Sequence, residues 1–236
     1  EAARRIREIS PQVKIMIGGP HVSSLVEETL RMGCFDYIFI GEAEQSFQQF
    51  LQGVEPSRID GIAFRDGSGA ISVRASGQYL KNLDDYPFPD YSLFNLDDYH
   101  IAKLQARRNP VVWIETSRGC PFDCKICNKV VHGQNFRPKS VDRVLAEIRY
   151  LKGLGVREIH IADDGFTSDM KRAELICDRI LAEGIDISWS CVNGIRVDRV
   201  SSHQLEKMKA AGCYRISFGI ESGNQRILDN LGKHIK

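Results

Sequence analysis

Residues 111–127 read VVWIETSRGCPFDCKIC, an apolar, β-branched run followed at once by three closely spaced cysteines. The composition of Val111–Ile114 is typical of a buried strand. Cys120, Cys124 and Cys127 then offer three thiols on one short loop. Three thiolates suit a soft, oxidisable metal centre and leave a fourth coordination position open. The stretch therefore indicates an enzyme whose chemistry begins where a strand ends.

Extended and helical patterns alternate regularly around this stretch. The expected strands cover residues 111–114, 158–162, 187–191 and 214–219, and the expected helices cover 140–153, 169–181, 201–212 and 225–231. Ser140, Asp169 and Ser201 begin the first three helices, and Gln204 completes a capping box with Ser201. Four successive βα units predict the first half of a TIM-type (β/α) barrel, in which chemistry gathers at the carboxyl ends of the strands. The cysteine loop lies at that end of the first strand.

The first fifty residues show the same alternation in a separate region. Strands are expected at 13–17 and 37–40, and helices at 2–9, 24–32 and 44–51. This α-β-α-β-α order predicts the C-terminal half of a doubly wound, Rossmann-like parallel sheet. Because the chain has no initiator Met and starts inside a helical pattern, we expect a fragment of a longer protein.

Residues 54–110 differ from both flanks. Residues 61–73 predict a hairpin about a Gly-rich turn, and residues 84–91 read DDYPFPDY, an aromatic linker punctuated by proline. We expect these aromatic side chains to pack on the neighbouring domains. The sequence thus predicts an N-terminal domain over 1–53, a hairpin and linker over 54–110, and a half barrel over 111–236.

Composition argues against several classes of protein. Lys and Arg total 32 against 31 Asp and Glu, a net charge of +1, so nothing indicates a nucleic-acid partner. No apolar run approaches the roughly 20 residues that a membrane helix needs, and the charged, amphipathic N-terminus is not a signal peptide. Four of the seven cysteines are scattered along the chain, which favours a reducing compartment over a disulfide framework. They are Cys34, Cys177, Cys191 and Cys213. We therefore expect a cytoplasmic protein without a membrane span.

The C-x3-C-x2-C spacing at the end of the first barrel strand resembles the signature of the radical S-adenosylmethionine (SAM) superfamily. Three such thiolates can hold three irons of a 4Fe-4S cluster and leave one iron open to an exogenous ligand. Other stretches resemble the cobalamin-binding subgroup of that superfamily. They are Ile17-Gly18-Gly19-Pro20-His21, Ile40-Gly41-Glu42-Ala43-Glu44, Leu83-Asp84-Asp85-Tyr86-Pro87-Phe88-Pro89, Thr116-Ser117-Arg118-Gly119-Cys120, Asp163-Asp164-Gly165-Phe166-Thr167 and Gly219-Ile220-Glu221-Ser222-Gly223. The resemblance implies that 1–53 is part of a cobalamin-binding domain and that 111–236 is the N-terminal half of a radical SAM barrel.

The resemblance also implies which residues contact each cofactor. Cys120, Cys124 and Cys127 would ligate the cluster. The implied contacts of SAM are Phe122, Ile126, Asp163, Arg196, Glu221 and Ser222, and those of cobalamin are Gly18, Gly19, Gly41 and Glu42. Ile126 stands where the family usually has an aromatic residue, but an aliphatic side chain can still pack against adenine. His21 is not assigned as a cobalt ligand, because the family's Asp-x-His-x-x-Gly motif is absent.

Three of these assignments have alternatives that the residues leave open. Glu221 follows a strand in a Gly-rich segment, where its carboxylate can accept hydrogen bonds from ribose hydroxyls or cap the next helix. Asp163 and Asp164 either face SAM or the substrate, or one of them caps a helix. Arg196 either pairs with the methionine carboxylate or forms a salt bridge with Asp198.

The principal hypothesis is a cobalamin-dependent radical SAM enzyme. By resemblance, the reduced cluster would cleave SAM to a 5′-deoxyadenosyl radical that takes a hydrogen atom from a small-molecule substrate, with methylation of an unactivated carbon as the expected reaction. An electron donor such as flavodoxin or ferredoxin is implied. One alternative is a radical SAM cyclase or rearrangement oxidoreductase without functional cobalamin. Another is a zinc-binding interaction module built from the three cysteines and His132.

Overall fold

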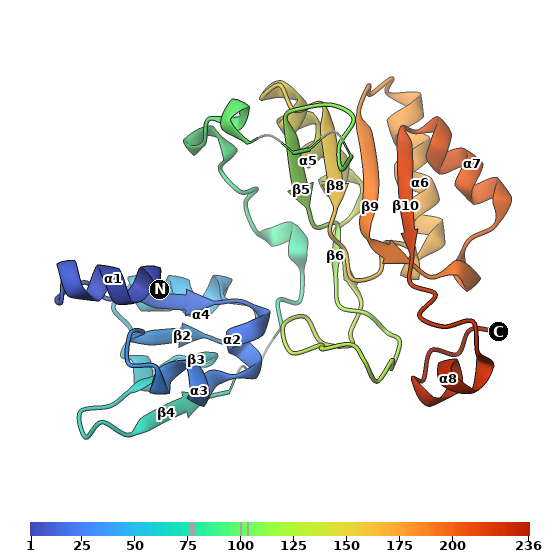
Figure 1. Cartoon of the computed structure of the whole chain (residues 1–236). Helices are drawn as coiled ribbons and strands as arrows, with labels where there is room; N and C mark the ends of the chain where they lie inside the picture. Colours follow the sequence, from blue (N-terminus) through green and yellow to red (C-terminus); the bar gives the residue numbers. More distant parts are fainter. Residues whose placement is uncertain (76–78, 100, 103) are drawn as a thin grey trace. The chain divides into compact units, whose positions relative to one another are not determined.

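The structure, a computed structural model, describes residues 1–75, 79–99, 101–102 and 104–236, which divide into two compact units (Figure 1). The N-terminal unit comprises Glu1–Leu80 and Asn128–Gly133, and the C-terminal unit comprises Lys81–Cys127 and Gln134–Lys236. Residues 128–133 therefore fold with the N-terminal unit although they directly follow Cys127. Within the described ranges, no helix has the length and apolar character needed to span a bilayer.

The N-terminal unit is built on a four-stranded sheet. Its elements are α1 (Ala2–Ile9), β1 (Met16–Gly18), α2 (Pro20–Ser24), α3 (Val26–Arg31), β2 (Tyr37–Phe39), α4 (Glu44–Leu51), a 3-10 turn at Pro56–Arg58, β3 (Ile62–Arg65) and β4 (Ile71–Arg74). The strand order is β1-β2-β3-β4. β1 and β2 are parallel, whereas β3 runs antiparallel to both β2 and β4.

The hairpin of β3 and β4 differs from its predicted role as part of a connection. Tyr37 of β2 pairs with Phe64, and Phe39 pairs with Ile62, so β3 extends the first sheet. An isolated two-stranded hairpin is marginally stable in water, and pairing with β2 supplies the missing partner strand. The hairpin therefore belongs to the N-terminal unit, which continues to Leu80 instead of ending at residue 53.

Apolar clusters cover both faces of this sheet. Because neighbouring residues of a strand point to opposite faces, Ile38 and Phe39 of β2 belong to different clusters. Ile38 packs with Leu30 of α3, and Phe39 packs with Ile59. Leu30, Ile38 and Ile59 are fully buried. The sheet is therefore a central layer, as an α/β unit requires.

The C-terminal unit is built on a parallel sheet in the order β5-β8-β9-β10. Its elements are 3-10 turns at Leu83–Asp85, Tyr91–Leu93 and Leu96–Asp98, then β5 (Val111–Ile114), β6 (Ser117–Arg118), β7 (Arg137–Pro138), α5 (Val141–Gly153), β8 (Glu158–Ile161), a 3-10 turn at Phe166–Ser168, α6 (Met170–Ala182), β9 (Ser188–Ile195), a 3-10 turn at Val197–Arg199, α7 (Ser202–Ala210), β10 (Cys213–Phe218) and α8 (Gln225–Asn230). Figure 1 shows α5, α6 and α7 along this sheet. The predicted α/β class with a parallel sheet is confirmed. Closure into a barrel and a doubly wound N-terminal sheet stay predictions.

Strand β8 shows how the two faces of the sheet differ. Ile159 and Ile161 pack in the large apolar core with residues of α5 and α6. Glu158 and His160 alternate with them and so point to the opposite face. There, Nε2 of His160 lies 2.9 Å from Oε1 of Glu158, and the hydroxyl of Tyr214 donates to the same oxygen at 2.5 Å. The face away from the helices is therefore polar and hydrogen-bonded.

The predicted helix starts are confirmed. The side chains of Ser140 and Asp169 each accept a hydrogen bond from the first turn of α5 and α6, and Ser201 forms the complete capping box with Gln204. These caps depend on residues three positions apart, so sequence alone carries the signal. They fix where each helix leaves the loop that follows the preceding strand.

The aromatic linker packs on the C-terminal unit. Phe88 stacks on Tyr150 of α5 with ring centroids 5.5 Å apart. The guanidinium carbon of Arg143 lies 3.6 Å from the centroid of the Phe88 ring. Tyr91 donates a hydrogen bond to the carbonyl oxygen of Trp113 at 3.2 Å. These contacts agree with the expected packing role of the linker.

Candidate metal and cofactor site

The three clustered cysteines lie on an irregular loop that follows β5 and the short strand β6. Cys124 is buried, Cys120 is partly buried and Cys127 is exposed, and none of the three is in a disulfide. The amide of Cys127 donates to the carbonyl of Cys124 at 3.2 Å, and the amide of Lys125 donates to the carbonyl of Leu231 at 2.9 Å. The loop therefore places three thiols at the carboxyl end of the parallel sheet.

The donor set suits an iron–sulfur cluster, although it does not form a closed cage. In the part of the chain that the structure describes, no three His, Cys, Asp or Glu side chains converge closely enough to hold a metal ion. Thiolates are the usual ligands of iron–sulfur clusters, and many metal sites form only when the metal binds. A 4Fe-4S cluster would be held by Cys120, Cys124 and Cys127 once it had drawn their side chains together.

Asp163, just after β8, binds the segment that leads into the cysteine loop. Asp163 is 2% exposed. Its carboxylate accepts hydrogen bonds from the amide of Thr116 at 2.6 Å, the hydroxyl of Thr116 at 2.5 Å and the hydroxyl of Ser117 at 2.6 Å. Burial raises the pKa of the Asp163 carboxyl, against the lowering effect of these donors. Asp164 accepts from the amide of Gly119 at 3.2 Å. Both aspartates therefore have partners in this segment rather than at a helix N-terminus.

Arg172, near the start of α6, binds the same segment. Its Nη2 donates to the carbonyl of Thr116 at 2.7 Å, and its Nε donates to the carbonyl of Lys139 at 2.8 Å. Only 8% of Arg172 is exposed. Thr116 therefore has its N–H bound by Asp163 and its C=O bound by Arg172.

Arg196 stacks on Phe122, which lies between the first two cysteines of the loop. The guanidinium carbon is 4.0 Å from the ring centroid. Nε and Nη2 of Arg196 each donate to Asp198 at 3.0 Å, so the salt bridge considered as an alternative is present. Burial alone would raise the pKa of Asp198, but the hydrogen bonds from Arg196 lower that pKa overall. Nη1 of Arg196 is buried and makes no hydrogen bond within the described residues.

Glu221 adopts a left-handed backbone conformation, with φ of 68°, which is uncommon outside glycine. Its Oε1 accepts a hydrogen bond from Nζ of Lys233 at 2.9 Å. The lysine side chain is 9% exposed and the glutamate side chain 35% exposed. A Cβ atom on Gly219 would lie 3.0 Å from that oxygen, so the glycine permits a close approach. The carboxylate is thus anchored by one partner and still accessible, as a contact to ribose requires.

The residues next to Glu221 show that it is not the cap of α8. Asn224 takes that place, because its side chain accepts a hydrogen bond from the amide of Arg226. The hydroxyl of Ser222 accepts from the amide of Asn224 at 3.1 Å. Ile126, the aliphatic residue of the cysteine loop, is 52% exposed, so its side chain can contact a ligand.

The predicted cobalamin contacts gather at one edge of the N-terminal sheet. Gly18 ends β1 and pairs with Phe39 near the end of β2, and Gly19, with φ of 110°, precedes the first turn of α2. The amide of Gly41 donates to the hydroxyl of Ser23 in α2 at 3.0 Å. Because β1 and β2 are parallel, the loops after them meet at the same edge, where open α/β sheets bind ligands.

Glu42 lies at this edge but points inward. Its side chain is 1% exposed, and its carboxylate accepts from the amide of Leu80 at 2.8 Å. Nδ1 of His132 lies 3.0 Å from the other carboxylate oxygen. His132 belongs to the N-terminal unit, whereas the three clustered cysteines belong to the C-terminal unit. The partnership with Glu42 argues against His132 as the fourth ligand of a zinc module.

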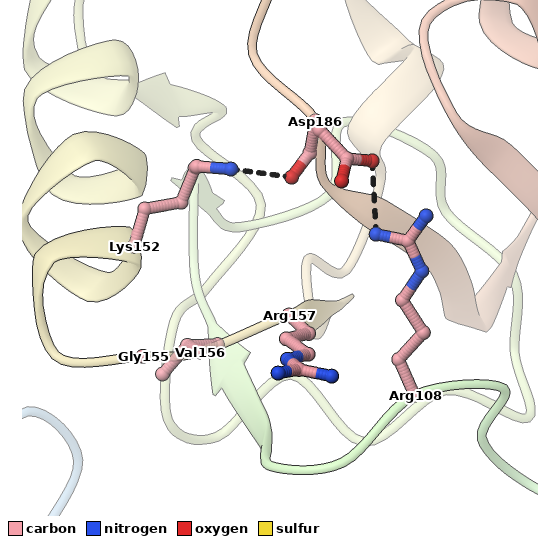
Figure 2. A pocket seen from close by; sticks show the side chains of 6 residues that line it. All are labelled: Arg108, Lys152, Gly155, Val156, Arg157 and Asp186. Atoms are coloured by element: carbon pink, nitrogen blue, oxygen red, sulfur yellow. Dashed lines mark hydrogen bonds and ion pairs between the residues drawn. The ribbon is translucent and has the colours of Figure 1, made fainter.

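A hollow of about 540 Å³ lies at the amino ends of the strands of the C-terminal unit, away from the cysteine loop. It is lined by Arg108, Lys152, Gly155, Val156, Arg157 and Asp186. Figure 2 shows Lys152 and Arg108 both reaching Asp186. Nζ of Lys152 donates to its carbonyl at 2.6 Å, and Nη1 of Arg108 donates to its carboxylate at 2.8 Å. These contacts join segments at the amino ends of the strands, the end of such sheets that usually contributes to stability and not to catalysis.

Comparison with protein families bears on the unit that carries the cysteine loop. The family model described as the Radical SAM superfamily matches residues 114–236, more than half of the chain. The chain belongs to the radical SAM superfamily. The matched range starts at the last residue of β5 and contains the cysteine loop, Asp163, Arg196 and Glu221.

Known proteins similar to this radical SAM chain extend beyond it. An uncharacterized methyltransferase of Pyrococcus horikoshii, PH0819, is 35% identical over 99% of this chain and 50% of its own length. The anaerobic magnesium-protoporphyrin IX monomethyl ester cyclase of Cereibacter sphaeroides is 25% identical over 99% of this chain and 39% of its own length. The solved structure of OxsB, a cobalamin-dependent S-adenosylmethionine radical enzyme with aqua-cobalamin and S-adenosylmethionine bound, has a TM-score of 0.72 at 23% identity, covering 94% of this chain and 33% of OxsB. That likeness shows the fold. The radical SAM chain spans about half the length of the first of these relatives.

Several residues of this radical SAM site were not found by sequence reasoning. Lys233 follows Glu221 by twelve positions across a helix, and Arg172 lies far along the chain from Thr116. No local sequence motif predicts either contact, because both depend on how α8 and α6 pack near the ends of the strands.

Proposed function

We propose that the chain is part of a cobalamin-dependent radical SAM enzyme that methylates an unactivated carbon of a small molecule. The observation that carries the proposal is the loop of Cys120, Cys124 and Cys127, which places three thiols at the carboxyl end of a parallel sheet within the family match. Cys120, Cys124 and Cys127 would hold a 4Fe-4S cluster, which would supply one electron for the reductive cleavage of SAM. An electron donor such as flavodoxin or ferredoxin would reduce this cluster.

The residues of the C-terminal unit would bind and orient SAM around the cluster. Glu221, held by Lys233, offers carboxylate oxygens to the ribose hydroxyls. Arg196, stacked on Phe122, offers its buried Nη1 to the methionine carboxylate. Ile126 can pack against adenine. Fixed contacts of this kind favour reaction by holding the reacting atoms in line.

The N-terminal unit would bind cobalamin at the edge formed by Gly18, Gly19 and Gly41. Support comes from the parallel pairing of β1 and β2, which brings these glycines to one edge, and from OxsB, whose solved structure contains aqua-cobalamin. The glycines would let the backbone approach a large, flat ligand. Glu42 would shape this edge through Leu80 and His132. The scattered positions of Cys34, Cys177, Cys191 and Cys213 support a cytoplasmic location.

The test is anaerobic purification of the full-length protein, with iron, sulfide, zinc and cobalamin quantified. We expect about four iron and four sulfide per protein together with cobalamin. The Cys120/Cys124/Cys127→Ala variant should lose iron and sulfide, whereas the control Cys34→Ala, which alters a buried cysteine of the N-terminal unit, should keep them. Stoichiometric zinc without sulfide would overturn the proposal.

A radical SAM cyclase without functional cobalamin is the second candidate. The similarity to the magnesium-protoporphyrin IX monomethyl ester cyclase supports the cyclase reaction of this candidate. Iron and sulfide without cobalamin after reconstitution of the full-length protein would support this candidate over the methyltransferase.

A further inference from the structure

We propose that Asp163 is a positioning residue for the cysteine loop, which it holds through Thr116 and Ser117, and not a direct ligand of SAM. The inference rests on the proposed function, since it assigns a role in preparing the loop for its cluster. It replaces the direct SAM contact that the family resemblance implied for this residue.

The hydrogen bonds of Asp163 all end on the segment before the first cysteine. Oδ1 accepts the amide of Thr116 at 2.6 Å, and Oδ2 accepts the hydroxyls of Thr116 and Ser117 at 2.5 and 2.6 Å. Asp163 is 2% exposed, and Thr116 and Ser117 are each 1% exposed. Both carboxylate oxygens are therefore occupied by protein donors, and little of the side chain is left for a cofactor.

Other contacts make this segment a fixed base for the loop. Arg172 donates to the carbonyl of Thr116 at 2.7 Å, and the amide of Lys139 donates to the same oxygen at 2.9 Å. Asp164 accepts from the amide of Gly119, one residue before Cys120. The chain is thus held on both sides of Arg118, immediately before the thiols begin.

The charge of Asp163 makes it the central member of this arrangement. Hydrogen bonds to a carboxylate are stronger than those between neutral groups. Removing an acceptor from buried donors leaves those donors without a partner and costs stability locally. Arg172 is buried beside the segment, and Asp163 has the largest favourable electrostatic effect of the carboxylates around it, so neutralising Asp163 would also weaken the compensation of a buried cation.

The experiment compares Asp163→Asn with the wild type in the full-length protein. Asparagine keeps the size of the side chain but replaces one acceptor oxygen by an NH₂ group. Thr116→Val is the second variant, because it removes one hydroxyl donor and leaves the carboxylate intact. Ile180→Ala is the matched control, since Ile180 is 3% exposed in α6 and packs in the core, away from the cysteine loop.

Three readouts are measured. They are hydrogen exchange of residues 115–127 in the cluster-free protein, iron, sulfide and the electron paramagnetic resonance spectrum after reconstitution, and equilibrium binding of SAM to the reconstituted protein. We expect Asp163→Asn to speed exchange in 115–127 about tenfold, the effect of losing one charged hydrogen bond. It should also lower the retained iron and broaden the spectrum. Thr116→Val should act in the same place with a smaller change. Ile180→Ala should speed exchange in α6 and leave 115–127 unchanged.

Two results would overturn the inference. One is unchanged exchange and iron content in Asp163→Asn with weakened SAM binding, which would make Asp163 a direct SAM ligand. The other is faster exchange spread over the whole unit, as in a general loss of stability. Absence of iron and sulfide from the wild-type protein would instead overturn the proposed function, while the exchange data would still decide whether Asp163 holds the loop.

Discussion

Lys233 places its Nζ 2.9 Å from Oε1 of Glu221, and the lysine side chain is only 9% exposed. A lysine buried to that degree needs an anionic partner. Glu221 supplies it while its own backbone adopts a φ of 68°. The pair therefore fixes where the Glu221 carboxylate sits after β10.

Replacing Lys233 by Met should weaken SAM binding in the full-length protein about tenfold, because Glu221 would lose the partner that orients it. Equilibrium binding of SAM to the reconstituted enzyme measures the effect. The control is Lys209→Met, which changes an exposed lysine of α7. Equal SAM affinity in the two variants would contradict the prediction.

Replacing Phe122 by Leu should weaken SAM binding about threefold, the usual size of a cation–π contact at a partly exposed site. The physical reason is that the ring holds the Arg196 guanidinium at 4.0 Å. Titration of the reconstituted full-length enzyme with SAM measures the loss. Arg199→Lys is the control, because Arg199 lies 5.2 Å from the same ring and its side chain is 54% exposed. A control that lost as much affinity as Phe122→Leu would argue against this role of the ring.

The environment of Glu158 predicts that the stability of the C-terminal unit depends on pH. Burial alone would raise its pKa, but hydrogen bonds from Tyr214, the amides of Arg107 and Arg108, and His160 lower the pKa of Glu158 overall. A carboxyl group whose pKa is lower in the folded than in the unfolded protein stabilises the folded state when the pH is above the unfolded-state pKa. This stabilisation is lost as the pH falls through the folded-state pKa.

We therefore expect hydrogen-exchange protection of residues 105–112 to fall as the pH drops from about 5 to below 4. Glu158→Gln should remove most of this pH dependence, whereas Glu206→Gln, on the exposed face of α7, should retain it. Unaltered pH dependence in Glu158→Gln would show that another group is responsible.

Replacing Glu42 by Gln should destabilise the N-terminal unit by about 1–3 kcal/mol, because the buried amide of Leu80 or the ring of His132 would lose its acceptor. Hydrogen exchange of residues 79–82 and 128–133 in the full-length protein reports the loss. Glu44→Gln, at an exposed position of the next helix, is the matched control. The prediction is contradicted if both variants exchange alike.

Local signals accounted for much of the fold. Ser140, Asp169 and Ser201 were predicted correctly because a cap involves only residues a few positions apart. The pairing of β3 with β2 was missed because Phe64 and Tyr37 lie far apart in sequence and no composition pattern specifies which strand a hairpin joins.

The candidate site was predictable to a similar extent. The three cysteines lie within eight positions of the sequence, so their pattern could be recognised from the sequence alone. The segment around Glu221 could be recognised by its resemblance to the family. The partners that hold these groups, Arg172 for Thr116 and Lys233 for Glu221, come from other elements. They depend on the packing of helices, which no short stretch of sequence contains.

The inclusion of residues 128–133 in the N-terminal unit has a consequence for evolution. Recombination that replaced only residues 1–80 would introduce most of a new N-terminal unit. It would retain residues 128–133 of the original unit, including His132, the partner of Glu42. A new unit would have to accept that inherited peptide or fold without it. The two segments of the N-terminal unit are therefore expected to evolve as a matched pair, with substitutions near Glu42 compensated by substitutions a few residues after Cys127.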